Sequence, residues 1–151
     1  MAYTIEIKNL DKLREAFEKM PEVVGKELKH TVNEVGALLT ETEKREAPIK
    51  SGTLRRDIAM RPFGFGVAVG PSMEYAFYVH EGTGLYGKRG DYIRPRKAKV
   101  LAFKGSNGQM VFTKRVAGQK PNPFVKRTVE QSEDKVNKII DNTLENIFKT
   151  I

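Results

Sequence analysis

Two long segments of the chain, one towards each end, repeat apolar residues at helical spacing. The first runs from Leu10 to about Ala47, with a stripe made of Val24, Leu28, Val32, Val35, Leu39 and Thr42. Pro21 suits the first turn of a new helix or a kink, and Pro48 ends the pattern because the residue before a proline avoids the helical region. The last segment carries a stripe made of Val125, Val129, Val136, Ile140, Leu144 and Ile147. We expect helices over 10–47 and 123–150.

Shorter patterns fill the rest of the chain. Alternating residues predict a strand at 3–8, and the region 55–115 has strand patterns near 58–60, 66–70, 100–103 and 110–113. Tyr75 to His80 is a continuous apolar run, which fits a buried strand or one to two turns of helix. The sequence therefore predicts one α+β domain over residues 1–151, in which the long N-terminal and C-terminal helices cover an antiparallel sheet of about four to five strands.

Composition excludes several kinds of chemistry. The chain has no cysteine, so disulfides, thiolate metal sites and cysteine nucleophiles are ruled out. His30 and His80 match no metal-ligand spacing. His80 and Glu81 are a possible acid–base pair, but the candidate nucleophiles Ser51, Thr53, Ser72 and Thr83 lie in no recognisable catalytic motif. We expect no enzyme, metal site or cofactor. No apolar run reaches the length of a membrane span and the N-terminus has no signal-peptide pattern, so no membrane association is expected.

Positive charge is concentrated in the middle of the chain. The whole sequence has 27 Lys and Arg against 19 Asp and Glu, and residues 48–127 alone have 16 against 4, a net charge of +12. Residues 82–99 are a long glycine-rich loop whose aromatic and basic residues are Tyr86, Lys88, Arg89, Tyr92, Arg94, Arg96, Lys97 and Lys99. Interleaved aromatic and basic residues suit single-stranded nucleic acid, and the charge alone suits an acidic protein surface. A solvated loop is the alternative interpretation.

Three further stretches form a recognisable set when they are taken in order. They are 47–54, where a helix ends and a Gly-Thr-Leu step follows, 70–83, which contains Tyr-Ala-Phe-Tyr-Val-His-Glu-Gly-Thr, and 119–124, which opens the last helix. Together they resemble the gene-product-ten-like head–tail joining family of long-tailed, non-contractile phages and prophages, over about residues 10–145. The matching positions are Pro48, Gly52, Leu54, Tyr75, Ala76, Tyr78, Val79, Glu81, Gly82, Thr83, Pro123 and Phe124. Residues 84–99 look like an insertion relative to the family.

The resemblance implies a structural virion protein without catalysis. It implies a ring of copies at the neck or tail end of the virion, made in the host cytoplasm, with connector or tail-tube proteins as neighbours and packaged DNA close by. A small basic nucleic-acid-binding module is the alternative function.

The motif residues also have folding roles of their own. Pro48 and Gly52 predict a sharp turn, Gly82 a backbone geometry that a side chain would block, and Pro123 and Phe124 the anchored start of the last helix. If 75–80 is helical, Ala76 and Val79 should face the core, with Tyr75 and Tyr78 at its edge.

Overall fold

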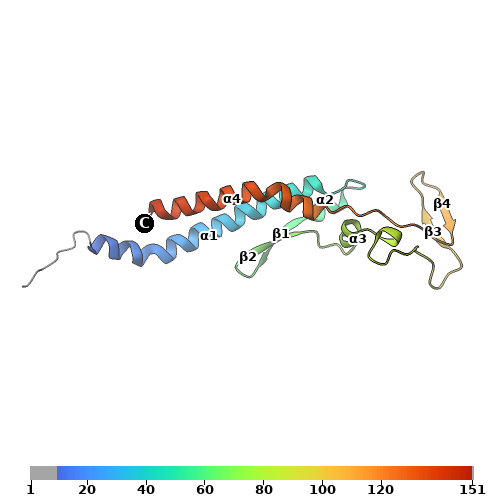
Figure 1. Cartoon of the computed structure of the whole chain (residues 1–151), viewed down its shortest axis with the longest axis horizontal. Helices are drawn as coiled ribbons and strands as arrows, with labels where there is room; N and C mark the ends of the chain where they lie inside the picture. Colours follow the sequence, from blue (N-terminus) through green and yellow to red (C-terminus); the bar gives the residue numbers. More distant parts are fainter. Residues whose placement is uncertain (1–9, 151) are drawn as a thin grey trace, which may run out of the picture.

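The computed structural model describes the backbone of residues 10–150 and the side chains of residues 15–150. Two long helices, α1 (Leu10–Glu46) and α4 (Phe124–Thr150), lie side by side (Figure 1). They are antiparallel, because Thr31 contacts Thr143 while Glu46, at the end of α1, binds Arg127 in the first turn of α4. Both predicted helices are confirmed. Pro21 lies inside α1, which continues through it without a new helix beginning there.

The face that α4 buries differs from the predicted apolar stripe. Val125, Val129, Ile140 and Leu144 are exposed, Val136 is half-buried, and Ile147, at 9% exposed, is the one buried residue of the predicted stripe. The buried residues of α4 are Phe124, Thr128, Ser132, Thr143 and Ile147. Small hydroxyl side chains let two helix backbones approach closely, and the hydroxyls of Thr128 and Thr143 donate to carbonyls one turn back in their own helix. The apolar stripe consequently faces outwards.

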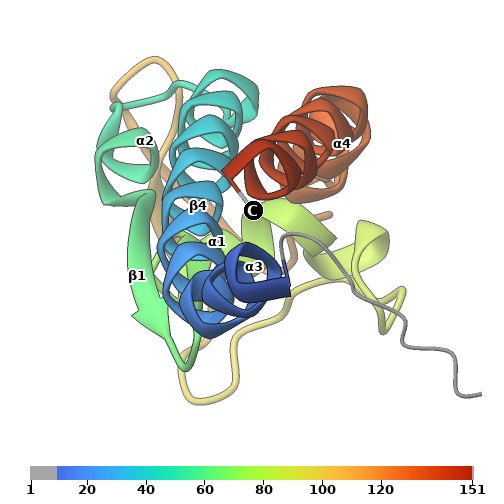
Figure 2. The same ribbon diagram turned by 90° about the vertical axis from the view of Figure 1, so that its left-hand side faces the viewer.

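A β-hairpin lies against the other side of α1. Strands β1 (Ala59–Phe63) and β2 (Gly66–Gly70) pair in antiparallel register from Ala59↔Gly70 to Phe63↔Gly66. Gly36 of α1 is buried beneath them, where a Cβ atom would collide with the Met60 sulfur and the Val67 side chain. Figure 2 shows α4 on one side of α1 and β1 on the other. The C-terminal helix therefore packs along α1 instead of covering the sheet.

The predicted sheet of four to five strands is wrong. Strands β3 (Leu101–Lys104) and β4 (Met110–Thr113) form a separate hairpin, so residues 10–150 contain two sheets of two strands each. The apolar run that fits a strand or a helix is the helix α3 (Tyr75–Glu81). In the chain, α3 and the loop after it lie between β2 and β3, and the two hairpins remain separate sheets. The strand predicted at 3–8 lies outside the described residues.

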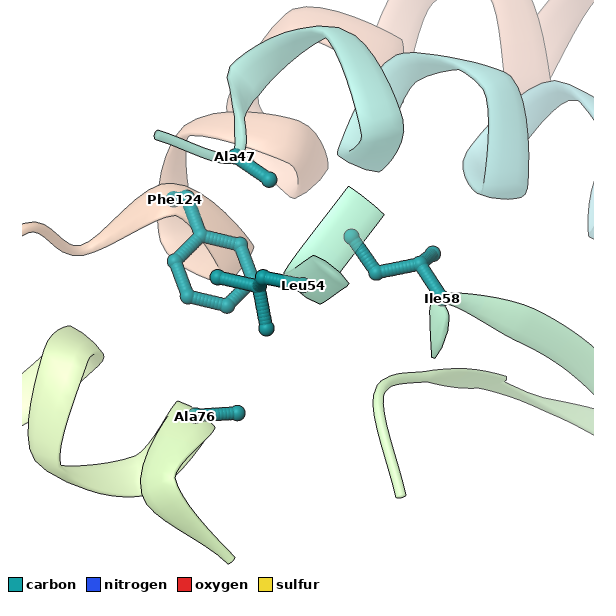
Figure 3. Packing of buried hydrophobic residues seen from close by; sticks show 5 residues of the cluster. All are labelled: Ala47, Leu54, Ile58, Ala76 and Phe124. Carbon is teal, nitrogen blue, oxygen red and sulfur yellow. The ribbon is translucent and has the colours of Figure 1, made fainter. Parts of the chain in front are cut away.

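The hydrophobic core is small and lies where the helix ends meet. It consists of Ala47 after α1, Leu54 in α2 (Thr53–Asp57), Ile58, Ala76 in α3 and Phe124 at the start of α4 (Figure 3). Val79 packs against this cluster, whereas Tyr75 and Tyr78 are largely exposed. The arrangement expected for a helical 75–80 segment is confirmed, and so is the role of Phe124 as an anchor.

Candidate functional site

A cleft of about 570 Å³ lies between α3 and the basic loop that follows it. Phe77 and Tyr78 of α3 form an aromatic wall, and their rings meet edge to face with centroids 5.8 Å apart. The remaining charged lining consists of four basic residues, Lys88, Arg89, Arg94 and Arg96, and two carboxylates, Glu81 and Asp91. The cleft is thus open, partly aromatic and net positive, a combination that suits an anionic chain with some apolar surface.

The loop is held at its base by the Gly-Thr step of the predicted motif. The Thr83 amide donates to the Gln119 carbonyl and the Gln119 amide donates to the Thr83 hydroxyl, both at 2.9 Å. Gly82 has φ +78, and a Cβ atom there would lie 2.9 Å from the Gln119 oxygen and the Pro121 nitrogen. The prediction that Gly82 permits a geometry closed to other residues is confirmed. Beyond this base the chain forms a 3-10 turn, η1 (Gly84–Tyr86).

The structure divides the predicted basic and aromatic residues between different places. Four of them line the cleft, namely Lys88, Arg89, Arg94 and Arg96. The Arg115 guanidinium lies 4.5 Å from the Tyr92 ring centre and the Lys120 amine 5.8 Å from that of Tyr86, so both tyrosines carry cations of their own chain. Lys97 and Lys99 are exposed on the way to β3. Tyr86 and Tyr92 are not among the residues that line the cleft, whose aromatic wall comes from Phe77 and Tyr78.

No family model, curated protein or solved structure matches the chain. Within residues 10–150 no helix combines the length and the apolar character needed to cross a membrane.

The aromatic wall of the cleft is positioned through Asp57. Its carboxylate accepts hydrogen bonds from the Ser72 amide at 2.6 Å, the Ser72 hydroxyl at 2.7 Å and the Met73 amide at 2.8 Å. The Ser72 hydroxyl above all, then the two amides and the Arg61 charge, hold the pKa of Asp57 below its ordinary value. These bonds fix the segment that leads into α3. Sequence reasoning missed Asp57, since its partners lie fifteen residues away.

A buried acid lies next to His80. Glu43 of α1 is 2% exposed, and burial raises the pKa of its carboxyl although the nearby His80 opposes the shift. Nδ1 of His80 lies 2.7 Å from the Glu81 carboxylate, and the His80 ring meets the Phe124 ring edge to face. Oε1 of Glu43 and Nε2 of His80 are buried without a hydrogen-bond partner in the described part of the chain.

The predicted acid–base pair of His80 and Glu81 forms, but the candidate nucleophiles are engaged elsewhere. The Ser51 and Thr53 hydroxyls bond each other at 2.8 Å, Ser72 bonds Asp57, and Thr83 bonds Gln119. Across residues 10–150 no three His, Cys, Asp or Glu side chains gather as a metal site would require. None of these four hydroxyls is hydrogen-bonded to the His80–Glu81 pair.

Most of the other motif residues lie beside the hydrophobic core. Pro48, Gly52, Leu54, Tyr75 and Val79 lie around a hollow of about 320 Å³ beside the core. Gly52 has φ +74 at the start of α2, as the predicted sharp turn needs. The Pro123 carbonyl accepts from the Arg127 amide in the first turn of α4.

Proposed function

We propose that the chain is a structural virion protein of a phage or prophage, acting at the head–tail junction or tail end as a tail-completion or head–tail joining component. The three stretches that resemble this family are far apart in sequence. The first stretch supplies Ala47 and Leu54, the second supplies Ala76 and the third supplies Phe124. These residues meet in one core (Figure 3). Convergence of separate motif stretches on one core supports treating them as parts of a single fold signature.

The observation that carries a role in assembly is the amount of surface the chain leaves exposed. Its accessible surface is 12346 Å². A compact monomer of 17.1 kDa exposes only about 7,700 Å². A subunit that completes its core against neighbours accounts for such a surplus, because assembly interfaces bury what the isolated chain leaves open.

The outer stripe of α4 supports the same role. Val129 is 60% exposed, Leu144 48% and Phe148 75%, and Ile140 lies on the same face. Contiguous apolar patches of this kind mark interaction surfaces on proteins. In a ring of copies, the stripe would face a neighbouring subunit or an adjacent ring, with no catalytic chemistry involved.

The basic cleft has a place in this proposal as the part that meets packaged DNA or an acidic neighbour. Its four cations are exposed at one end of an elongated molecule (Figure 1). Around a DNA path, basic side chains on each copy would repeat about the ring axis.

Deletion of the gene from a phage or prophage that carries it tests the proposal. The expected lysate contains filled heads and tails that remain separate in electron micrographs, and a plasmid copy restores joined virions. Normal virions after deletion would reject the proposal.

A charge variant then tests the cleft. Replacing Lys88, Arg89, Arg94 and Arg96 together by Gln should lower the yield of joined virions. The control replaces four exposed helical lysines, Lys19, Lys26, Lys135 and Lys138, by Gln, which removes the same charge elsewhere. Equal yields from the two variants would remove the cleft from the proposed role.

The second candidate function is a small nucleic-acid-binding module, favoured by the four cations beside the Phe77 and Tyr78 rings. It predicts that the chain binds single-stranded oligonucleotides and that its affinity falls steeply with salt. A plot of the logarithm of the binding constant against the logarithm of the salt concentration should have a slope of about −0.7 per phosphate contacted. Absence of binding at low salt would eliminate this function and leave the assembly role untouched.

A further inference from the structure

The β3–β4 hairpin is apolar on both of its faces and lies apart from both long helices (Figure 1). Its register places Phe103 opposite Val111 on one face, and Phe112 opposite Ala102 on the other. Phe112 is 66% exposed and Met110 57%. A hairpin of two strands is at best marginally stable in water unless a helix or further strands cover it. These faces therefore need a partner.

A groove of complementary character lies elsewhere on the molecule. It has a volume of about 660 Å³ and runs between α1 and the β1–β2 turn. Its apolar wall is formed by Leu28 and Val32 of α1 and by Pro62, Phe65 and Val67 of the hairpin. Leu28 is 52% exposed, and Phe65, at the tip of the turn, is fully exposed. Leu28, Pro62 and Phe65 are exposed together along this groove, and grouped apolar residues of this kind mark an interaction surface.

A copy cannot fill its own groove. The β3–β4 hairpin projects at one end of the molecule, whereas the β1–β2 turn lies beside the long middle part of α1 (Figure 1). A projecting hairpin and a hollow groove are different surfaces, so contact between them joins copies head to tail. Head-to-tail contacts close into rings when the rotation between copies allows it.

The two segments that carry these surfaces have opposite net charge. Residues 97–116, which contain the hairpin, have five Lys and Arg and no carboxylate. Residues 15–34 of α1, which contain the helical wall of the groove, have five carboxylates against three lysines, of which Lys29 itself lines the groove. Such complementarity speeds encounter and disfavours hairpin-to-hairpin contact, where like charges would meet.

We propose that the β3–β4 hairpin of one copy docks in the groove between α1 and the β1–β2 turn of a second copy. This contact rests on the proposed ring and on no other part of the proposed function. Each subunit in a ring buries one hairpin and one groove. A contact of standard size buries about 1,600 Å² in total. That area is smaller than the difference between the accessible surface of the chain and that of a compact monomer of the same mass.

The absence of native cysteine makes a direct test possible. Leu28→Cys on one copy and Phe112→Cys on another, distinguished by a tag, are mixed and treated with a short bis-maleimide. The expected result is several-fold more tagged–untagged product than from the control mixture of Lys138→Cys with Phe112→Cys. Lys138 is an exposed residue of α4 that belongs neither to the groove nor to the apolar stripe. Addition of Phe65→Asp to the Leu28→Cys copy should return the yield to the control level.

Each other outcome overturns the contact. Equal yields from the two mixtures would show that the groove does not receive the hairpin. A dominant product between two Phe112→Cys copies would assign the hairpin to a symmetric partner instead. Circular dichroism should show unchanged helix content for every variant. Phe112 lies in a hairpin apart from the long helices, and the side chains of Leu28 and Phe65 are exposed. The deletion experiment described above can fail or succeed independently of this result.

Discussion

The hydroxyl oxygens of Thr31 and Thr143 lie 2.6 Å apart, buried between the two long helices. Each hydroxyl is also within 3 Å of a carbonyl of its own helix, that of Glu27 for Thr31 and that of Ile139 for Thr143. The two hydroxyl protons can satisfy only two of these three contacts, and across the helix pair one threonine donates while the other accepts. This contact sets the register of α1 against α4, because a shift of either helix would separate the two oxygens.

The first prediction concerns this pair. Thr31→Val and Thr143→Val should each lower the free energy of unfolding, and the double variant should lose less than the sum of the two. A coupling of about 1 kcal/mol is expected for one buried neutral hydrogen bond. Urea denaturation of the four proteins measures it, and strictly additive losses would show that the hydroxyls do not interact.

The second prediction concerns which face of α4 is buried. Ile147→Ala should destabilise the isolated chain by about 2 kcal/mol or more, as truncation of a buried aliphatic side chain does. Leu144→Ala, three residues away on the exposed stripe, should change stability by less than about 0.5 kcal/mol. Thermal unfolding of both variants provides the comparison. A larger loss for Leu144→Ala would mean that the predicted stripe is the buried one after all.

The third prediction separates backbone strain from steric collision. Gly90 has φ +66 with open space around it, so Gly90→Ala should cost about 1 kcal/mol from backbone conformation alone. Gly82→Ala adds a collision with the Gln119 carbonyl and should cost clearly more, about 2 kcal/mol or above. Chemical denaturation tests both. Similar losses at the two sites would contradict a special role for the Gly82 contact with 119–121.

The fourth prediction follows from the lowered pKa of Asp57. Because its pKa is lower in the folded chain than in the unfolded one, its contribution is complete above its ordinary pKa of 3.8 and is lost as pH falls through the lower folded value. Asp57→Asn should therefore be less stable than the native chain at pH 7 and should lose less stability on acidification below about pH 4. Unfolding measured from pH 2 to 7 tests this, and parallel profiles would refute it.

The fifth prediction has the opposite sign. Burial raises the pKa of Glu43, so its charged form opposes folding, and the penalty grows as pH rises from its ordinary pKa of 4.5 through the folded value. Glu43→Gln should be more stable than the native chain at pH 7, with the difference vanishing near pH 4. Glu41→Gln, an exposed neighbour in the same helix, serves as the control. If the Glu43→Gln chain is no more stable than the Glu41→Gln control at pH 7, burial does not raise the pKa of Glu43 as the structure indicates.

Much of the local structure was predictable from particular residues. Pro48 stops α1 because the residue before a proline avoids helical geometry, and the helix ends at Glu46. Gly52 and Gly82 take positive φ values where the sequence predicted sharp turns. The strand pattern near 58–60 extends further than expected, since β1 continues through Pro62 to Phe63 and the turn falls at Gly64 and Phe65.

The candidate site was predictable only in part. Its four basic residues stand out by charge alone, but Phe77 and Tyr78 form its wall only because 75–81 is helical, which periodicity over so short a run could not decide. Asp57 and Glu43 gave no signal, because their environments are made by segments distant in the chain.

By itself the sequence determined where the two long helices lie, where glycine must bend the chain and where positive charge gathers, because these depend on neighbouring residues. Only the tertiary structure decided that the strands form two separate hairpins and that α4 buries threonine and serine while its valine, isoleucine and leucine stripe faces out. An apolar stripe indicates that a surface will be covered, but it does not specify by what. Close helix approach through Thr31 and Thr143 depends on side-chain size and on a partner 112 residues away, which no local pattern encodes.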